Sequence, residues 1–212
     1  MDWQPRLPQE IEAESFRRIE ARVGSHHLPP DVWFLVRRII HTTADLDYLK
    51  TVRVHPQAIA QGVEALRRGA PLATDTRMLL SGISTGRLKR LAVEPFCLMD
   101  DPAVAQAAQR QGTTRAAAAM EAALPRLAGG IVAIGNAPTA LLRLLELLQD
   151  GAPPPALVVG IPVGFVNAQE SKELLTKQNC PYITALGPKG GSAVAASVIN
   201  ALAIMALEET TS

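Results

Sequence analysis

The sequence predicts an α/β fold with three layers, α/β/α, around a parallel sheet of about five strands. Two observations favour it. Short apolar runs without polar alternation, such as residues 130–135 and 156–162, are typical of strands that are covered on both faces. Helical patterns of about 10–15 residues separate these runs, which favours parallel pairing. The chain has 212 residues, 48% of them hydrophobic, so we expect residues 1–212 to form a single domain.

The first half of the chain begins with helical spacing of apolar residues. Gly24 and the pair Pro29–Pro30 separate the first two helices. Gly69 is a typical helix stop, and we expect Asp75 to cap the helix that follows it. The elements expected in this half are helices over 11–23, 30–41, 55–69 and 75–82, and short strands over 49–54 and 71–74.

The second half alternates strands and helices. Asp101 and Pro102 have the residue types of a helix start, and the glycine pair at 190–191 precedes an Ala-rich final helix. The elements expected in this half are strands over 91–99, 130–135, 156–162 and 181–186, and helices over 101–110, 113–127, 138–149, 167–177 and 190–207.

The helix expected over 30–41 has an unusual polar face. At about 100° per residue, its apolar side chains gather on one side, and we expect that side to pack against the core. Phe34, Arg38 and His41 gather on the opposite side, with Arg37 at its edge. The apolar side consists of Val32, Leu35, Val36, Ile39 and Ile40.

His41 is the candidate catalytic residue of this face. A lone helical histidine is more often structural or solvated. Here the end of the helix favours the charged imidazolium and Arg38 disfavours it, so the two effects oppose each other. Imidazole is the side chain that exchanges protons most readily near neutral pH. We therefore interpret His41 as an acid–base group beside an arginine suited to an acidic substrate.

Two further side chains break their local patterns. Ser15 interrupts a helical row formed by Ile11 and Ile19; it either bonds to its own helix backbone or points into a pocket. Arg115 is expected in the first turn of an Ala-rich helix, where a cation opposes the helix dipole unless an anion is shared. Both are candidate substrate-binding residues.

Three glycine-containing loops follow expected strands and should meet at the carboxyl edge of the sheet, where ligands bind in open parallel sheets. They contain Asn136, Gly164 and Ser192, which we take as candidate substrate-binding residues. Ordinary turn chemistry would explain any one of these loops, but three in succession favour a site. None contains a GxGxxG or GxxxxGK[ST] pattern, so the sequence does not predict a nucleotide cofactor.

Composition excludes other classes. The net charge is +1, although 16 of the 21 basic residues are arginine, so binding to nucleic acid through bulk charge is not expected. No apolar run approaches the roughly 20 residues of a membrane span, and the first residues contain no apolar signal core, so we expect a cytoplasmic protein. Cys97 and Cys180 lie far apart without ligands at metal spacing, so we expect free thiols and no metal site.

Long strings of this sequence resemble the precorrin-8X methylmutase family, including its cobalt-precorrin-8 counterpart. The resemblance covers roughly residues 11–206 and is far more specific than any single motif above. The strings that carry it are residues 14–16, 38–41, 69–72, 114–115, 127–140, 150–153, 160–166, 170–172 and 190–192.

The resemblance implies an intramolecular methyl shift between adjacent ring carbons of a corrin precursor, giving hydrogenobyrinate or its cobalt analogue. It places the catalytic histidine on His41 and the substrate-contacting serine and arginine on Ser15 and Arg38. It also implies a homodimer and no cofactor, because any cobalt belongs to the substrate. Whether the substrate carries cobalt stays open. The alternatives are a non-catalytic corrinoid or tetrapyrrole carrier, and a different α/β enzyme acting on a small polyanion.

Overall fold

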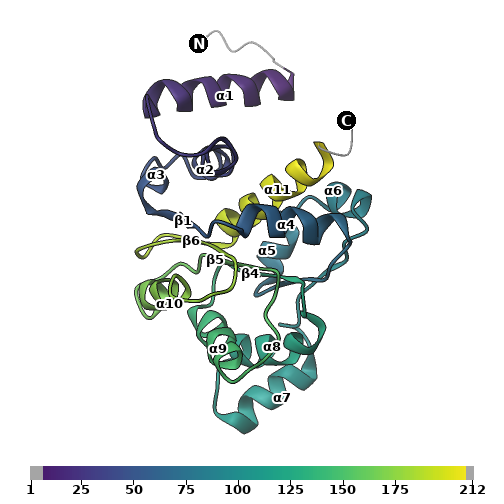
Figure 1. Ribbon diagram of the computed structural model, residues 1–212. Coiled ribbons are helices and arrows are strands. Elements are labelled where there is room, and N and C mark those ends of the chain that lie inside the picture. The colour runs from purple at the N-terminus through teal and green to yellow at the C-terminus, as the bar shows by residue number, and fades with distance from the viewer. Residues whose placement is uncertain (1–6, 209–212) are drawn as a thin grey trace.

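The computed structural model of the chain describes residues 7–208 and contains one six-stranded sheet (Figure 1). The strand order is β1-β6-β5-β4-β2-β3. Five neighbouring strands run parallel, as predicted, and β1 adds an antiparallel edge beside β6. The strands are β1 (Val52–Val54), β2 (Leu72–Thr74), β3 (Pro95–Phe96), β4 (Ile131–Ile134), β5 (Leu157–Gly160) and β6 (Tyr182–Ala185).

Helices cover both faces of this sheet, so the predicted three-layer α/β/α fold is confirmed. On one face α4 and α11 pack against the sheet, and α2 packs against α11 with α1 outside it; on the other face lie α8, α9 and α10 (Figure 1). The helices are α1 (Pro8–Val23), α2 (Pro30–Thr43), α3 (Tyr48–Thr51), α4 (Ala58–Arg67), α5 (Arg77–Gly82), α6 (Thr85–Arg90), α7 (Pro102–Gln111), α8 (Arg115–Ala123), the 3₁₀ turn η1 (Leu124–Arg126), α9 (Pro138–Gln149), α10 (Ala168–Leu175) and α11 (Ser192–Glu208).

The central strands are the apolar runs identified in the sequence. All four residues of β4 are 0% exposed, and β5 is buried along its whole length. Helix α11 is also buried over most of its length, because it lies between the sheet and α2. Helix α2 is therefore separated from the sheet by α11. One side of α2 packs on α11, and the other side is free to form a site.

Two expected strands were wrong, and one helix was not expected. The strand expected over 91–99 is only two residues long, because β3 is a half-exposed edge strand. The first part of the strand expected over 49–54 is the helical turn α3. Helix α6 was not predicted; its position depends on Asn200 in distant α11, whose Oδ1 accepts from the Ser84 N–H at 2.8 Å.

Asp75 does not cap α5. The cap is Thr76, whose hydroxyl oxygen accepts from the Leu79 N–H at 3.1 Å. Both cysteines are free, with Cys180 buried and Cys97 half-buried. No helix among the described residues is long and apolar enough to cross a membrane.

Candidate active site

His41 lies in the last turn of α2, and the two faces of this helix are as predicted. Leu35, Val36, Ile39 and Ile40 are at most 1% exposed, whereas the His41 side is open to solvent. The helix ends at Thr43, and the capping residue Ala44 adopts a left-handed conformation and donates its N–H to the carbonyl of Ile40 at 2.8 Å. The core thus fixes one face of α2 and directs His41 outward.

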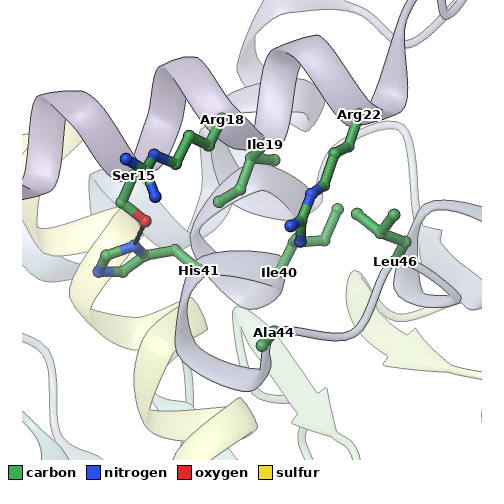
Figure 2. A pocket seen from close by; sticks show the side chains of 8 residues that line it. All are labelled: Ser15, Arg18, Ile19, Arg22, Ile40, His41, Ala44 and Leu46. Atoms are coloured by element: carbon green, nitrogen blue, oxygen red, sulfur yellow. Dashed lines mark hydrogen bonds between the residues drawn. The ribbon is translucent and has the colours of Figure 1, made fainter.

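The imidazole of His41 is bonded to a residue of α1. The hydroxyl Oγ of Ser15 lies 2.7 Å from Nδ1 of His41 (Figure 2). Phe16, the next residue, packs its ring 5.2 Å from the imidazole between centroids. A hydroxyl can donate to a neutral imidazole and accept from a charged one. Ser15 can therefore hold His41 in both protonation states while Nε2 stays available to a ligand.

Two arginines of α2 surround the same aromatic side chain. The guanidinium carbons of Arg37 and Arg38 lie 4.4 Å and 5.5 Å from the centre of the Phe16 ring. Each also forms an ion pair with α1, Arg37 with Glu20 and Arg38 with Glu12. These contacts fasten α1 across α2 and place Arg38 on the same side as His41, as predicted.

Two hollows meet at His41. The first, of about 240 Å³, lies between α1 and α2, and Figure 2 shows its side chains. The second, of about 260 Å³, lies between α2, α6 and α11, with the end of α5 beside it. The first hollow is lined by Ser15, Arg18, Ile19, Arg22, Ile40 and Leu46 in addition to His41 and Ala44. The second includes Arg38, Gly82, Arg87, Ala193, Ala196 and Asn200.

At the carboxyl edge of the sheet, the loop after β4 is held by Asp75. This side chain is 3% exposed, and its two carboxylate oxygens accept three N–H bonds, from Gly135 at 3.0 Å and from Asn136 and Ala137 at 2.8 Å each. Burial raises the pKa of Asp75, although the three N–H donors act in the opposite direction. These three N–H groups are therefore occupied by a carboxylate of the protein itself.

The loops after β5 and β6 are held in a similar way. Lys172 on α10 is fully buried and donates from Nζ to the carbonyl of Lys189 at 2.8 Å. Burial lowers the pKa of Lys172 to about 8. The Gly164 N–H donates to the Pro188 carbonyl, which joins the two loops. Gly164 therefore takes part in the contact between these two loops.

Lys189 connects these loops to the segment that follows α2. Its Nζ bonds Asp45 at 2.5 Å and Asp47 at 2.7 Å. The ammonium group lowers the pKa of the Asp45 carboxyl, and the two carboxylates raise the pKa of Lys189. The carboxyl edge is thus tied to the end of the helix that carries His41.

The structure brings together only part of the predicted site. His41, Ser15 and Arg38 form one cluster. The other four candidate residues do not line either hollow beside His41 in the described part of the chain. Ser192 is buried and its hydroxyl lies 3.0 Å from that of Thr76, although its neighbour Ala193 lines the second hollow. The remaining three, at the carboxyl edge or at the start of α8, are Arg115, Asn136 and Gly164.

Three arginines in the hollows were missed. Arg18 and Arg22 follow Ser15 at helical spacing, so extending the row of Ser15 and Ile19 would have found them. Arg87 lies on α6, an element that the sequence did not predict, so no local pattern pointed to it.

The fold and the site define an α/β protein with an oriented, solvent-accessible histidine between arginine-lined hollows. The comparisons are specific. The family model described as precorrin-8X methylmutase matches residues 10–205, so the chain belongs to the precorrin-8X methylmutase family. It is a methylmutase, an isomerase of cobalamin biosynthesis.

Relatives cover almost the whole chain. The cobalt-precorrin-8 methylmutase of Leptospira interrogans is 42% identical, over 94% of each chain. The precorrin-8X methylmutase of Pseudomonas aeruginosa is 43% identical, over 92% of this chain and 94% of its own. The crystal structure of precorrin-8X methylmutase from Thermus thermophilus has a TM-score of 0.86 at 40% identity, covering 94% of this chain and 98% of its own.

Proposed function

We propose that this enzyme moves a methyl group between adjacent ring carbons of precorrin-8X, or of cobalt-precorrin-8, to give hydrogenobyrinate or its cobalt analogue, cobyrinate, with His41 as proton donor and acceptor. The observation that supports His41 most directly is its 2.7 Å contact with Ser15, which orients the ring and leaves Nε2 where two hollows meet. Relatives bearing both substrate names match at similar identity, so both forms are candidates.

The proposed step is an isomerisation in which nothing is gained or lost. Nε2 of His41 donates a proton to the conjugated ring system. The bond from the methyl carbon to one ring carbon breaks as the bond to its neighbour forms, and the proton then returns to Nε2. Because the methyl group moves within one molecule, no methyl donor is required. General acid–base help of this kind typically contributes 10²–10⁴-fold.

The arginines around His41 are suited to a substrate that carries several carboxylates. Arg38 lies beside His41 in one hollow, and Arg18 and Arg22 line the other. A charge-assisted hydrogen bond to a carboxylate arm contributes roughly 1.5–3 kcal/mol. Arms held on either side of His41 would orient the ring against the imidazole.

Neither hollow alone would enclose a large flat macrocycle, so we propose that the substrate extends past His41 and that a second copy of the chain covers it in a homodimer. Arg115, Asn136, Gly164 and Ser192 are proposed to contact its outer parts. We further propose that the whole chain acts as one cytoplasmic domain.

The experiment that tests His41 is its replacement by asparagine, which keeps a polar group beside Ser15 but cannot relay a proton. We expect turnover of precorrin-8X, followed by its spectral change, to fall at least 10²-fold while corrinoid binding changes little. His27→Asn, in an exposed loop, is the matched control and should leave turnover unchanged.

The same experiment excludes the corrinoid carrier weighed from the sequence, because a carrier would bind both substrate forms without any spectral change in the parent protein. Turnover by His41→Asn at the parental rate would instead refute the role of His41 alone and leave the methylmutase assignment in place.

A further inference from the structure

The hollow between α2, α6 and α11 has two walls that carry charge and a floor of small side chains. Arg38 and His41 stand on one wall, and Arg87 lines the other. The floor is formed by Ala193, Ala196 and Ser197 of α11. A Cβ on Gly82 would lie 2.9 Å from the Cβ of Ala196, so the end of α5 approaches α11 as closely as a glycine permits.

Arg87 differs from the other partly buried arginines. Four arginines among the described residues are half-buried, and three of them have a carboxylate partner: Arg37 with Glu20, Arg38 with Glu12 and Arg143 with Glu121. Within residues 7–208 the guanidinium of Arg87 has no hydrogen-bond or ion-pair partner, although its carbonyl accepts the Leu91 N–H. A guanidinium stays charged at all relevant pH values, and removing it from water without a counter-charge is unfavourable. The Arg87 guanidinium is therefore available to pair with an anion that enters the hollow.

The position of Arg87 is fixed by a side chain of α11. Asn200 accepts from the Ser84 N–H at 2.8 Å and donates from Nδ2 to the Gly82 carbonyl at 2.9 Å. Both halves of the amide are used, so the turn before α6 can neither rotate nor move away without losing a bond. Helix α6 has only six residues, and this clamp holds it across the hollow from α2.

We infer that Arg87 binds a carboxylate arm of the corrinoid from the side opposite Arg38, and that Asn200 is its positioning residue. This inference rests on the proposed function. Two arginines on opposite walls would hold two arms of one ring, which fixes the ring relative to Nε2 of His41 better than a single attachment does. The pair selects a macrocycle with free carboxylate arms over the same macrocycle with neutral arms.

The test uses hydrogenobyrinate as the probe, with the intact protein and the variants Arg87→Gln and Arg87→Lys. We expect the dissociation constant to rise about tenfold or more for Arg87→Gln and less for Arg87→Lys, which keeps the charge but loses the fork of donors. In turnover, KM should rise more than kcat falls. Arg90→Gln, an exposed residue of the same helix, is the matched control and should bind as the parent does.

Esterifying the probe supplies a second readout. The parent should bind fully esterified hydrogenobyrinate more weakly than the free acid, and Arg87→Gln should lose less on esterification than the parent does. Asn200→Asp replaces the amide that donates to the Gly82 carbonyl by an acceptor. Introduced alone, it should weaken binding of hydrogenobyrinate, and it should have a much smaller effect when Arg87→Gln is already present. A purely structural role of Asn200 would give the same effect in both backgrounds.

The outcomes separate the two proposals. If the parent isomerises precorrin-8X and Arg87→Gln binds the probe as tightly as the parent, the inference is wrong and the proposed function stands. The inference is also wrong if the variant only dissociates an oligomer in sedimentation, because the anion matched to Arg87 would then belong to another chain. If the parent neither binds nor isomerises any corrinoid, the proposed function itself fails.

Discussion

The hollows at His41 and the loops at the carboxyl edge of the sheet both concentrate polar groups, and they use them differently. At the carboxyl edge Asp75 and Lys172 are buried, and each is bonded to the backbone of a neighbouring loop. At His41 the imidazole is exposed with one hydroxyl partner, and the guanidinium of Arg87 has no partner within the described residues. The first region is closed by its own chain, whereas the second leaves donors and charges available.

The difference shows that a glycine-rich loop at a strand end is weak evidence for a ligand site. A Cβ on Gly135 would lie 2.7 Å from the Cα of Ser192, so this glycine is needed where α11 begins beside the loop after β4. Its own N–H and that of Asn136 donate to the carboxylate of Asp75. Unpartnered charge on a packed helix is the stronger evidence.

The largest effect that would test this comparison is expected from Asp75→Ala. The substitution leaves three backbone N–H groups without their acceptor, and an unsatisfied buried donor costs about 1–3 kcal/mol. Because two of the three are only partly buried, we expect a loss of about 3 kcal/mol in the free energy of unfolding, measured by urea denaturation. Asp75→Asn keeps one acceptor oxygen and should lose less.

The control for Asp75 comes from the other region. His41→Ala removes an exposed side chain, so its free energy of unfolding should stay within about 1 kcal/mol of the parent. A stable Asp75→Ala that has lost corrinoid binding would reverse the comparison and make the carboxyl edge the binding site.

The next effect concerns Lys172 and pH. Its pKa is about 8 in the folded protein and close to 10.5 in the unfolded chain, so between these values the unfolded chain binds more protons. The contribution of Lys172 to the free energy of unfolding therefore rises with pH from 8 to 10.5, by at most about 1.4 kcal/mol per pH unit. Below pH 8 this gain is absent, because the lysine is charged in both states.

Lys172→Met removes this titration and leaves every other group in place. Denaturation at about pH 7.5, 8.5 and 9.5 should show the parent gaining stability relative to the variant as the pH rises. Lys177→Met, an exposed lysine just after α10, should track the parent at all three values. If the difference in stability between the parent and the Lys172→Met variant is independent of pH, Lys172 titrates alike in both states and is not held in a closed region.

The sequence predicted the parts of the fold that depend on local pattern. The apolar runs located four of the five parallel strands, each one to three residues longer than observed, and helical spacing identified both faces of α2 with His41 on the open one. The family resemblance and helix periodicity agreed on His41, Ser15 and Arg38, which the structure places together.

The parts that could not be predicted depend on contacts between distant residues. Asp75 has the sequence context of a helix cap, but its acceptors are used by a loop 60 residues further along the chain. Helix α6 depends on Asn200, 116 residues from Ser84, so neither α6 nor the placement of Arg87 leaves a local signal. The same holds for Lys172, whose burial depends on the loop after β6.

The smallest effect is expected from Ser15→Ala, and it is the most direct test of what the open region does. The bond to Nδ1 orients an exposed ring, so its loss should lower kcat about tenfold, equivalent to about 1.4 kcal/mol, and change the free energy of unfolding by less than about 1 kcal/mol. Turnover of precorrin-8X and urea denaturation measure the two quantities, with the exposed Ser25→Ala as the control. If the region around His41 is open, Ser15→Ala should lower kcat while the free energy of unfolding stays nearly unchanged. A Ser15→Ala protein that keeps its kcat but unfolds as readily as Asp75→Ala would show that the Ser15–His41 bond holds α1 to α2, and the region around His41 would then be closed by its own contacts like the carboxyl edge.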